Sequence, residues 1–326
     1  MDITAWSAVS PYGLDRSCFA DGIRSGRAAM VWADPAGPAS ARACLVPGFD
    51  QREALGRKGT KGMDRLTGFA VHAVAKAGAH RGPDTAVVLG TTTGSVKSVA
   101  DFTRASMTGE RPFDVDPVRI PSVVMNTPAG HSAIWHGITG PNATIASGRA
   151  SGLLGLSYAR RLLRTGRARR VLCGAAEEYS TARSWLSHGA LLGEGAAVLR
   201  LEAEGARGAL ATVLGLGFGL DSVPAVARSA LRQAGIVAED VWAVVPGTRA
   251  ERDELAGMFG ACVLDRVSPV DELIGDTGAV SAVFQIAAAL VVSVNQPASR
   301  VALVTTADPM GTTAAAVLVL HGTGEP

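Results

Sequence analysis

Apolar residues along this chain fall into short continuous runs, separated by polar and glycine-rich segments. Runs such as VLCGAA and AAVLRL lack the alternation of a half-exposed strand, and they predict strands buried on both faces. The longest apolar run, residues 278–294, is near the lower length limit for a membrane span and contains Gln285. We interpret it as a helix with protein on all sides, which indicates a layered α/β fold.

The order of the predicted elements repeats along the chain. A strand with its turn, an apolar helix and two further strands occur in this order in both halves. The corresponding pairs are residues 85–94 with 241–249, the helix after Arg149 with the helix from Gly278, 169–178 with 299–308, and 195–202 with 313–322. Four pairs in register predict a duplication. We therefore expect two halves joined near residues 203–210, namely 1–205 and a shortened 206–326.

Composition and charge narrow the class of protein. A hydrophobic content of 47% in 326 residues is enough for a sizeable core. The net charge of +2 gives no reason to expect nucleic acid or a membrane surface as a partner. The N-terminus has no basic segment followed by an apolar run, so we expect no signal peptide. The cysteines have no CxxC and no metal-ligand spacing, which favours a cytoplasmic protein with free thiols and no metal: Cys18, Cys44, Cys173 and Cys262.

One short segment carries an unusual charge. Residues 143–152, ATIASGRASG, predict a strand, a glycine-containing turn and the first turn of a helix. Arg149 lies at the predicted helix N-terminus, where free N–H groups and the helix dipole favour an anion or a nucleophile. A cation there is disfavoured by roughly 0.3–1 kcal/mol. We therefore expect Arg149 to have an acidic partner.

Several motifs in the same order resemble the β-ketoacyl synthases of the thiolase superfamily. Residues 120–152 follow that family's pattern almost position by position, including Asn126 and the GP before the nucleophile strand. Residues 57–78, 191–202 and 305–318 resemble its early interface helix, its GEGA strand and its C-terminal glycine-rich turn. The resemblance implies a thiolase-like fold in which two βα halves form α-β-α-β-α layers around buried central helices.

The residues that would carry condensation differ from the family pattern. Family catalysts read T-A-C-x-S-G at the nucleophile, and Arg149 stands at the cysteine. Pro246 replaces the first histidine, of the H-G-T motif, and Asp276 replaces the second, of K-S-x-x-G-H, in which Asp271 stands at the lysine and Glu272 at the serine. Condensation requires a thiolate and donors to an enolate oxygen. The resemblance therefore implies a chain without condensing activity and without a cofactor.

An intact scaffold without these residues resembles the chain-length factors, or ketosynthase β subunits, of type II polyketide synthases. Such a factor pairs with an active ketosynthase α subunit and helps to set the length of the acyl chain carried by an acyl carrier protein. The shortened loop between residues 180 and 190 favours a reduced or polyene product over an aromatic one. Two alternatives are a separate acyltransferase or decarboxylase that works without the cysteine, and a homodimeric binding protein.

The resemblance also indicates which residues face the partner. We expect residues 121–133 and 142–147 to form the interface. In the family, the helix after the early GT..G turn projects side chains toward the partner's tunnel, which here indicates the chain-length residues Val99, Phe102, Val124 and Met125. The alternative is that these four side chains form plain interface core.

Arg149 and Asp276 take the positions of two residues that face each other across a small cavity in active relatives. We therefore expect a bidentate ion pair between them. Asp271 and Glu272 are reserve partners. The alternative is that Arg149 turns to solvent or reaches across the dimer interface.

Overall fold

The computed structural model describes residues 1–37, 41–188, 190–220, 222–294, 296 and 298–322. Its strands follow the apolar runs: β1 (Asp2–Val9), β2 (Val31–Ala33), β3 (Arg42–Cys44), β4 (Thr85–Gly90), β5 (Asn142–Ile145), β6 (Arg170–Glu177), β7 (Leu192–Gly193), β8 (Gly195–Glu202), β9 (Ala211–Gly219), β10 (Val241–Val245), β11 (Arg300–Ala307) and β12 (Thr313–Leu320).

The α-helices are α1 (Arg16–Ser25), α2 (Gln51–Leu55), α3 (Arg65–Lys76), α4 (Val96–Thr108), α5 (Thr127–His136), α6 (Ser151–Arg164), α7 (Thr181–Leu186), α8 (Val223–Ala234), α9 (Arg249–Leu255), α10 (Ala261–Leu264), α11 (Val270–Ile274) and α12 (Ser281–Ser293). Short 3₁₀ helices are η1 (Pro117–Val123), η2 (Ala238–Asp240) and η3 (Gly278–Val280).

Most of the strands form one nine-stranded sheet with the order β10-β11-β12-β9-β1-β8-β6-β4-β5. The first half contributes β5-β4-β6-β8-β1 and the second contributes β10-β11-β12-β9, so the two series run in the same order. Between β10 and β11, the described residues form no counterpart of β5. The series meet where β1 pairs antiparallel with β9. The domain division at residue 205, in the loop between β8 and β9, stays a prediction.

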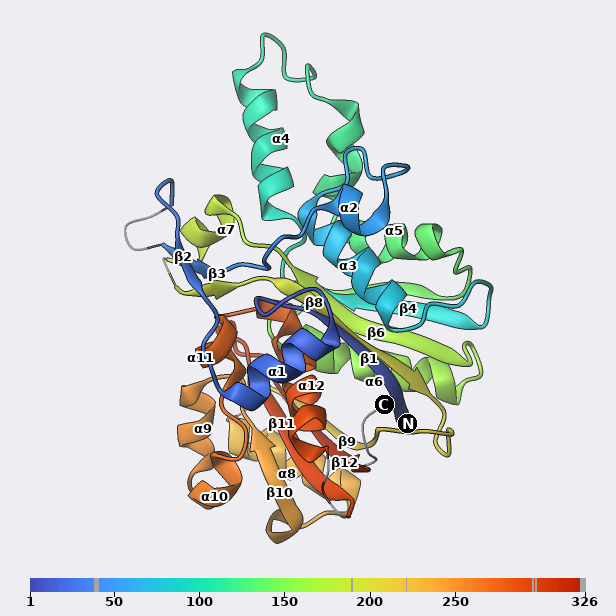
Figure 1. The fold of residues 1–326 in the computed structure, drawn as a ribbon, viewed down its shortest axis with the longest axis vertical. Coiled ribbons are helices and arrows are strands. Elements are labelled where there is room, and N and C mark those ends of the chain that lie inside the picture. The colour runs from blue at the N-terminus through green and yellow to red at the C-terminus, as the bar shows by residue number, and fades with distance from the viewer. Residues whose placement is uncertain (38–40, 189, 221, 295, 297, 323–326) are drawn as a thin grey trace.

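Helices cover both faces of each series. Helix α3 packs on β1, β6 and β8, while α6 packs on β4 and β6. Helix α8 packs on β9, β11 and β12. Helix α12 lies between the series, because it contacts β1 and β8 as well as β10, β11 and α6 (Figure 1). The expected α-β-α-β-α layering, with central helices α6 and α12, is therefore confirmed.

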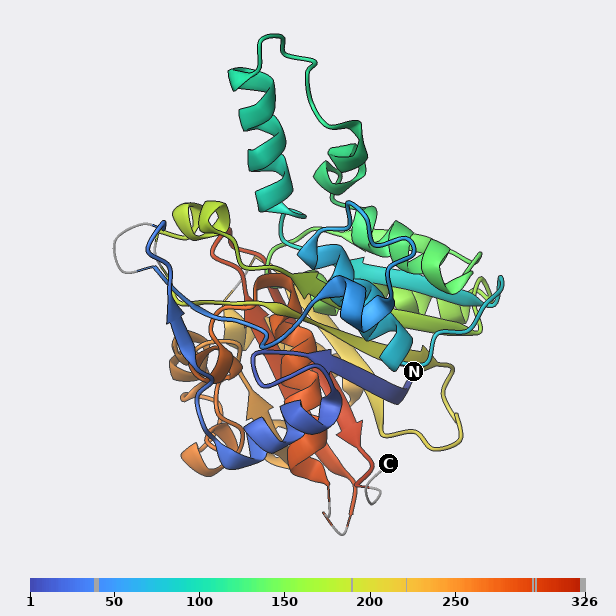
Figure 2. The ribbon, with the colours of Figure 1, turned by 45° about the horizontal axis from the view of Figure 1, so that its top comes forward.

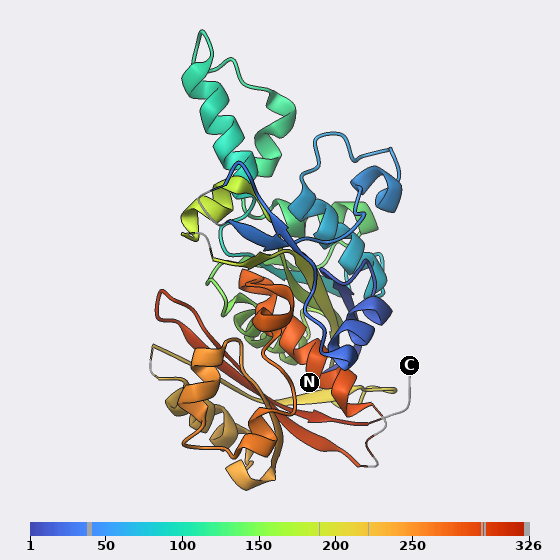
Figure 3. The ribbon, with the colours of Figure 1, turned by 60° about the vertical axis from the view of Figure 1, so that its left-hand side comes forward.

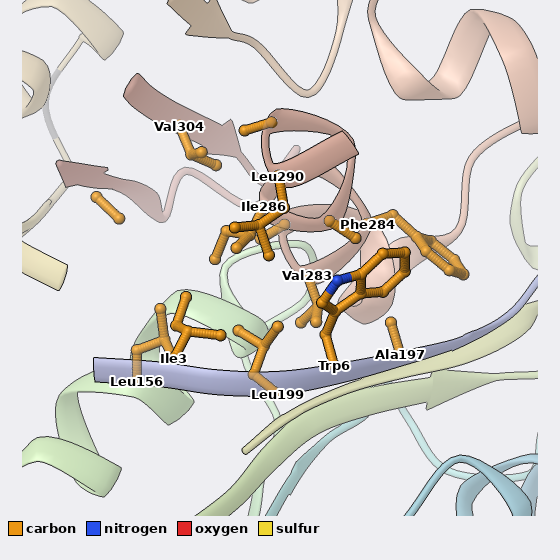
Figure 4. Packing of buried hydrophobic residues seen from close by; sticks show 14 of the residues in the cluster. Ile3, Trp6, Leu156, Ala197, Leu199, Val283, Phe284, Ile286, Leu290 and Val304 are labelled. Carbon is orange, nitrogen blue, oxygen red and sulfur yellow. The ribbon is translucent and has the colours of Figure 1, made fainter. Parts of the chain in front are cut away.

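The central helix α12 is buried on all sides, as its uniform hydrophobicity predicts. Trp6 of β1, Leu156 of α6 and Val304 of β11 surround it (Figure 4). Its single amide side chain is bonded through its nitrogen, because Gln285 Nε2 donates to the carbonyl oxygens of two strands, at residues 245 and 305, at 2.6 and 2.7 Å, while Oε1 has no hydrogen-bond partner among the described residues. In the described part of the chain, no helix is long and apolar enough to cross a membrane.

A long projection leaves the body of the molecule after β4. We call residues 95–125 the arm; it consists of α4, a connecting turn and η1, and it extends away from the sheet in every view (Figures 1, 2 and 3). No residue of α4 is buried. The two ends of the arm approach closely, because a Cβ atom on Gly94 would lie 2.9 Å from the Cα atom of Met125. Gly94 also has a φ of +74°, so the position favours glycine twice.

Candidate functional site

Arg149 occupies the turn between β5 and α6, as the sequence predicts. Gly148 turns the chain with a φ of +53°, and a Cβ atom there would lie 1.7 Å from Asp308 Oδ2. Helix α6 begins at Ser151, whose hydroxyl accepts a hydrogen bond from Ser147 N at 2.9 Å. The Arg149 side chain is 14% exposed and points toward the second half of the molecule, where its partner lies.

The structure brings Arg149 and Asp276 together. Arg149 Nη2 donates to Asp276 Oδ2 at 2.7 Å. The other carboxylate oxygen, Oδ1, accepts from the backbone N–H of Gly278 at 2.8 Å. The pair therefore has one direct hydrogen bond instead of the expected bidentate contact, because the start of the second central helix uses the second oxygen. Neither the solvent-facing nor the cross-interface alternative describes Arg149 here.

Charge and burial act in opposite directions on this pair. Burial is the largest single influence and disfavours both ions, but the nearby opposite charges and the hydrogen bonds together outweigh it in each case. The pKa of Arg149 is raised above its usual value by the charge of Asp276 despite burial. The pKa of Asp276 is lowered despite burial, first by Arg149 and then by Arg183. Arg183 Nη2 also donates to the Asp276 carbonyl oxygen at 3.2 Å.

The ion pair joins equivalent points of the two halves. Arg149 lies just before α6, and Asp276 lies just before η3 and α12. The two helices approach closely near these points, since a Cβ atom on Gly152 would lie 2.9 Å from a methyl carbon of Val283. A cation from one half and an anion from the other thus meet at the starts of two packed, duplicated helices.

A second carboxylate lies at the start of α6. The backbone N–H of Arg149 donates to Asp308 Oδ2 at 2.8 Å, and Met310 N donates to Oδ1 at 2.9 Å. Asp308 thus supplies the anion that a helix N-terminus favours, and it offsets the unfavourable position of the arginine. Sequence reasoning missed Asp308. It lies in the glycine-rich turn 307–311, but its spacing does not indicate that this turn folds against α6.

The reserve partners have other roles. Asp271 is half-buried; burial raises its pKa to about 6, although Arg149 opposes the shift. Glu272 instead forms an exposed ion pair with Arg249, with Nε 2.8 Å from Oε1. Neither residue makes a direct hydrogen bond to Arg149 among the contacts of the described residues.

Pro246, at the position of the first lost histidine, is buried directly after β10. Next to it, Glu251 accepts hydrogen bonds from Gly247 N at 3.1 Å and Ala307 N at 3.0 Å, and Thr305 Oγ1 donates to it at 3.0 Å. Burial raises the pKa of Glu251 to about 7. Sequence reasoning missed this glutamate, because a charged residue in a short exposed-looking helix gives no sign of burial.

The expected chain-length residues lie on the arm, apart from the ion pair. Val99 on α4 is 42% exposed and Phe102, one turn further, is half-buried. Val124 and Met125 follow η1 and are also exposed. The structure brings these side chains to one projection, without assigning them a role.

Chemically, the site holds ions in place of reacting groups. Arg149 supplies neither a thiolate nor a base, and Pro246 has no side-chain donor. The backbone N–H of Arg149, which could stabilise an oxyanion, is already bonded to Asp308.

Comparisons with known proteins agree with this geometry. The family model "Beta-ketoacyl synthase, N-terminal domain" matches residues 2–193. The 3-oxoacyl-[acyl-carrier-protein] synthase 2 of Synechocystis sp. is 29% identical over 200 residues, which cover 56% of this chain and 46% of that protein. Its namesake in Vibrio cholerae is 25% identical over 266 residues, covering 66% of this chain and 64% of that protein. This chain therefore spans less than two thirds of the length of these curated relatives.

Among solved structures, "The ishigamide ketosynthase/chain length factor" is 45% identical, with a TM-score of 0.91, and the match covers 98% of this chain and 99% of that one. A β-ketoacyl synthase from Burkholderia phymatum is 21% identical with a TM-score of 0.80, covers 98% of each chain and shows the same fold. The matched domain model and the full-length structural relative show that this chain belongs to the β-ketoacyl synthase family.

Proposed function

We propose that this chain is a non-condensing subunit, a chain-length factor, of a type II polyketide synthase. The observation that carries the proposal is the Arg149–Asp276 ion pair. Its two residues occupy the positions of the family's nucleophile and second histidine, within an intact family fold. The full-length similarity to a ketosynthase/chain length factor structure supports the same role. The alternative, an acyltransferase or decarboxylase that works without the cysteine, is disfavoured because Asp308 occupies the N–H that an oxyanion would need.

We propose that an active ketosynthase covers the face formed by α5 and β5. Strand β5 is an edge of the nine-stranded sheet, and edge strands are normally covered or blunted. Beside it, Ile134 of α5 is 78% exposed. The arm adds apolar side chains that are exposed in the isolated chain: Val99, Met107, Phe113, Val118, Ile120, Val124 and Met125. Permanent complexes of this kind bury about 2,000 Å² or more in total.

On this proposal, the arm helps to set the length of a polyketide or polyene chain that an acyl carrier protein delivers. Val99 and Phe102 are three positions apart on α4 and share a helix face, as a plug in the partner's tunnel requires. Val124 and Met125 lie behind them at the inner end of the arm.

We also place the protein in a reducing compartment, the cytoplasm, because all four of its cysteines are free thiols.

The test is co-expression with the cysteine-containing ketosynthase of the same gene cluster, followed by assay of the purified complex with acyl carrier protein and extender units. We expect the two chains to copurify, and this chain alone to aggregate because its apolar face is exposed. Replacing the partner's nucleophilic cysteine by alanine should abolish all condensation. Product formation by that variant complex, or by this chain alone, would instead support the cysteine-independent enzyme.

A further inference from the structure

The orientation of the arm is fixed at its base. Helix α4 has no buried residue, and on one side it borders a groove of about 1150 Å³ that is lined by Lys97 and Asp101 of the arm and by Trp32 and Trp185 of the body. Its main packing is on η1, which belongs to the arm, and on the short helix α7. Hydrophobic packing against the body therefore does little to fix the direction of α4.

Two adjacent glutamates at the end of β6 hold the turn from which the arm leaves. Glu177 is buried, and its Oε1 accepts a short hydrogen bond from the backbone N–H of Thr92. Glu178 is 3% exposed, and its Oε1 accepts from Ser95 Oγ at 2.6 Å. The other oxygen of Glu178 accepts from Leu66 N, in the first turn of α3, at 3.2 Å.

Ser95 is the residue that links Glu178 to the arm. It is the N-cap of α4, and its Oγ accepts a hydrogen bond from Ser98 N at 3.1 Å. One carboxylate therefore lies at the N-termini of both α3, which packs on the sheet, and α4, which does not. Both helix dipoles favour a negative charge there. This carboxylate thus joins the first residue of the arm to the first turn of α3, while η1 contacts the body separately, where Ser122 Oγ donates to the Gly62 carbonyl oxygen at 3.3 Å.

We propose that Glu178 and Ser95 are positioning residues that set the direction of the arm and, through it, the length of the product. The inference rests on the proposed function, in which Val99 and Phe102 reach the partner's tunnel. Neither Glu178 nor Ser95 contacts the acyl chain; both act through the arm.

The distance along α4 from Ser95 to Phe102 is long enough for a small tilt of the helix to displace the phenyl ring. Phe102 lies seven residues beyond Ser95, which is about 10 Å along the helix. A tilt of about 10° at the base moves that ring by about 2 Å, more than the length of a C–C bond. Tightly packed side chains respond to changes as small as one methylene group, so such a shift changes the space that a tunnel leaves for a growing chain.

Three variants of this chain, each in complex with its ketosynthase, test the proposal. Ser95→Ala and Glu178→Leu both remove the link between the base and the arm. Glu178→Gln restores it, because the amide oxygen can accept from Leu66 N while the amide nitrogen donates to Ser95 Oγ. Asp15→Ala is the matched control: it removes the N-cap of α1, which accepts from Cys18 N at 3.0 Å and belongs to another part of the molecule.

We expect Ser95→Ala and Glu178→Leu to raise the share of products of abnormal length at least three-fold, with total condensation within two-fold of the parent. Hydrogen exchange of the α4 amides in the complex should become at least ten-fold faster in both variants. Glu178→Gln and Asp15→Ala should match the parent in both measurements. Restoration by the glutamine variant separates positioning from a general loss of stability.

Unchanged products and unchanged α4 exchange in Ser95→Ala and Glu178→Leu would overturn the positioning role while Phe102→Ala still alters chain length. If Phe102→Ala also leaves the products unchanged, the proposed function of the arm fails, and the positioning role fails with it. These two failures are distinguishable in one set of complexes.

Discussion

At the scale of single residues, charged side chains held by hydrogen bonds occupy the region in which the family's catalytic residues lie. The Arg149–Asp276 pair could be predicted from the sequence, because family motifs align both positions and a lone arginine at a helix start needs an anion. Asp308 and Glu251 could not, because their roles depend on how distant turns fold against the site. The number of hydrogen bonds in the pair could not be predicted from the sequence either, because it depends on the backbone N–H of Gly278, which bonds to Asp276 Oδ1.

The pair makes the first prediction. Asp276→Ala should lower the free energy of unfolding of the complex by about 2–4 kcal/mol, somewhat below a fully buried pair because Asp276 is 27% exposed. The double variant Arg149→Leu, Asp276→Leu should lose much less, since no unpaired charge remains. Urea unfolding of the purified complexes measures both. Equal losses for the single and the double variant would contradict a coupled pair.

The glycine before the arginine can be tested separately. Gly148→Ala places a Cβ atom on Asp308 in a backbone with φ of +53°, whereas Gly166→Ala has a similar φ of +65° with no atom within 4 Å. The left-handed conformation costs each variant about 1–2 kcal/mol. The clash should add about 1–3 kcal/mol at residue 148 alone. Thermal unfolding of the two variants, each compared with the parent, gives the difference. Identical losses would mean that Asp308 moves aside freely.

The raised pKa values of two buried glutamates lead to a prediction of how the stability of the protein depends on pH. Burial raises the pKa of both Glu178 and Glu251 to about 7, so the folded state holds protons there that the unfolded state has released. Stability should therefore fall as pH rises, by about 1.5 kcal/mol between pH 6.5 and 8 for the two groups together. Below that range His72 and His136, whose pKa values burial lowers, act in the opposite direction.

Glu178→Gln removes one titrating group and should reduce this dependence, while Glu251 and Glu177, whose pKa burial also raises, retain part of it. Urea unfolding at pH 6.5, 7.2 and 8 measures the slope for both proteins. A parent protein whose stability rises over this range would refute the assignment.

At the scale of elements, hydrophobic patterning predicted the repeated strands β4, β6, β8, β10, β11 and β12 and the buried central helix. It missed β1 and β9, the strands that join the halves, and the short strands β2, β3 and β7. The arm was predicted only as a helix after a turn. Its projection could not be predicted, because α4 has an ordinary amphipathic composition and only tertiary structure reveals that none of it is buried.

The arm carries the prediction on chain length. Phe102→Ala should lengthen the products of the complex, because removal of the ring opens space at the end of the partner's tunnel. Phe113→Ala, at the outer part of the arm, should leave the length unchanged. Mass spectrometry of the products measures both, after chromatography has shown intact complexes. An unchanged distribution for Phe102→Ala would exclude this residue as a plug.

At the scale of the whole molecule, the chain has an uncovered edge strand and an apolar face on one side. Ile134→Glu should weaken assembly with the ketosynthase at least ten-fold, because it buries a charge in the interface. Val237→Glu changes an exposed valine of the second half and should leave assembly unchanged. Analytical ultracentrifugation of the mixed chains distinguishes these outcomes. Normal assembly of the Ile134 variant would place the interface elsewhere.

The meeting of Arg149 and Asp276 at equivalent points of a duplicated fold also bears on the order in which the ancestral catalyst was lost. An aspartate without its arginine can take up a proton and become neutral, whereas an arginine without its aspartate stays charged. The route of lower cost therefore replaces the histidine first and the cysteine second. On that route the base is lost before the nucleophile, and the second substitution then makes the first hard to reverse.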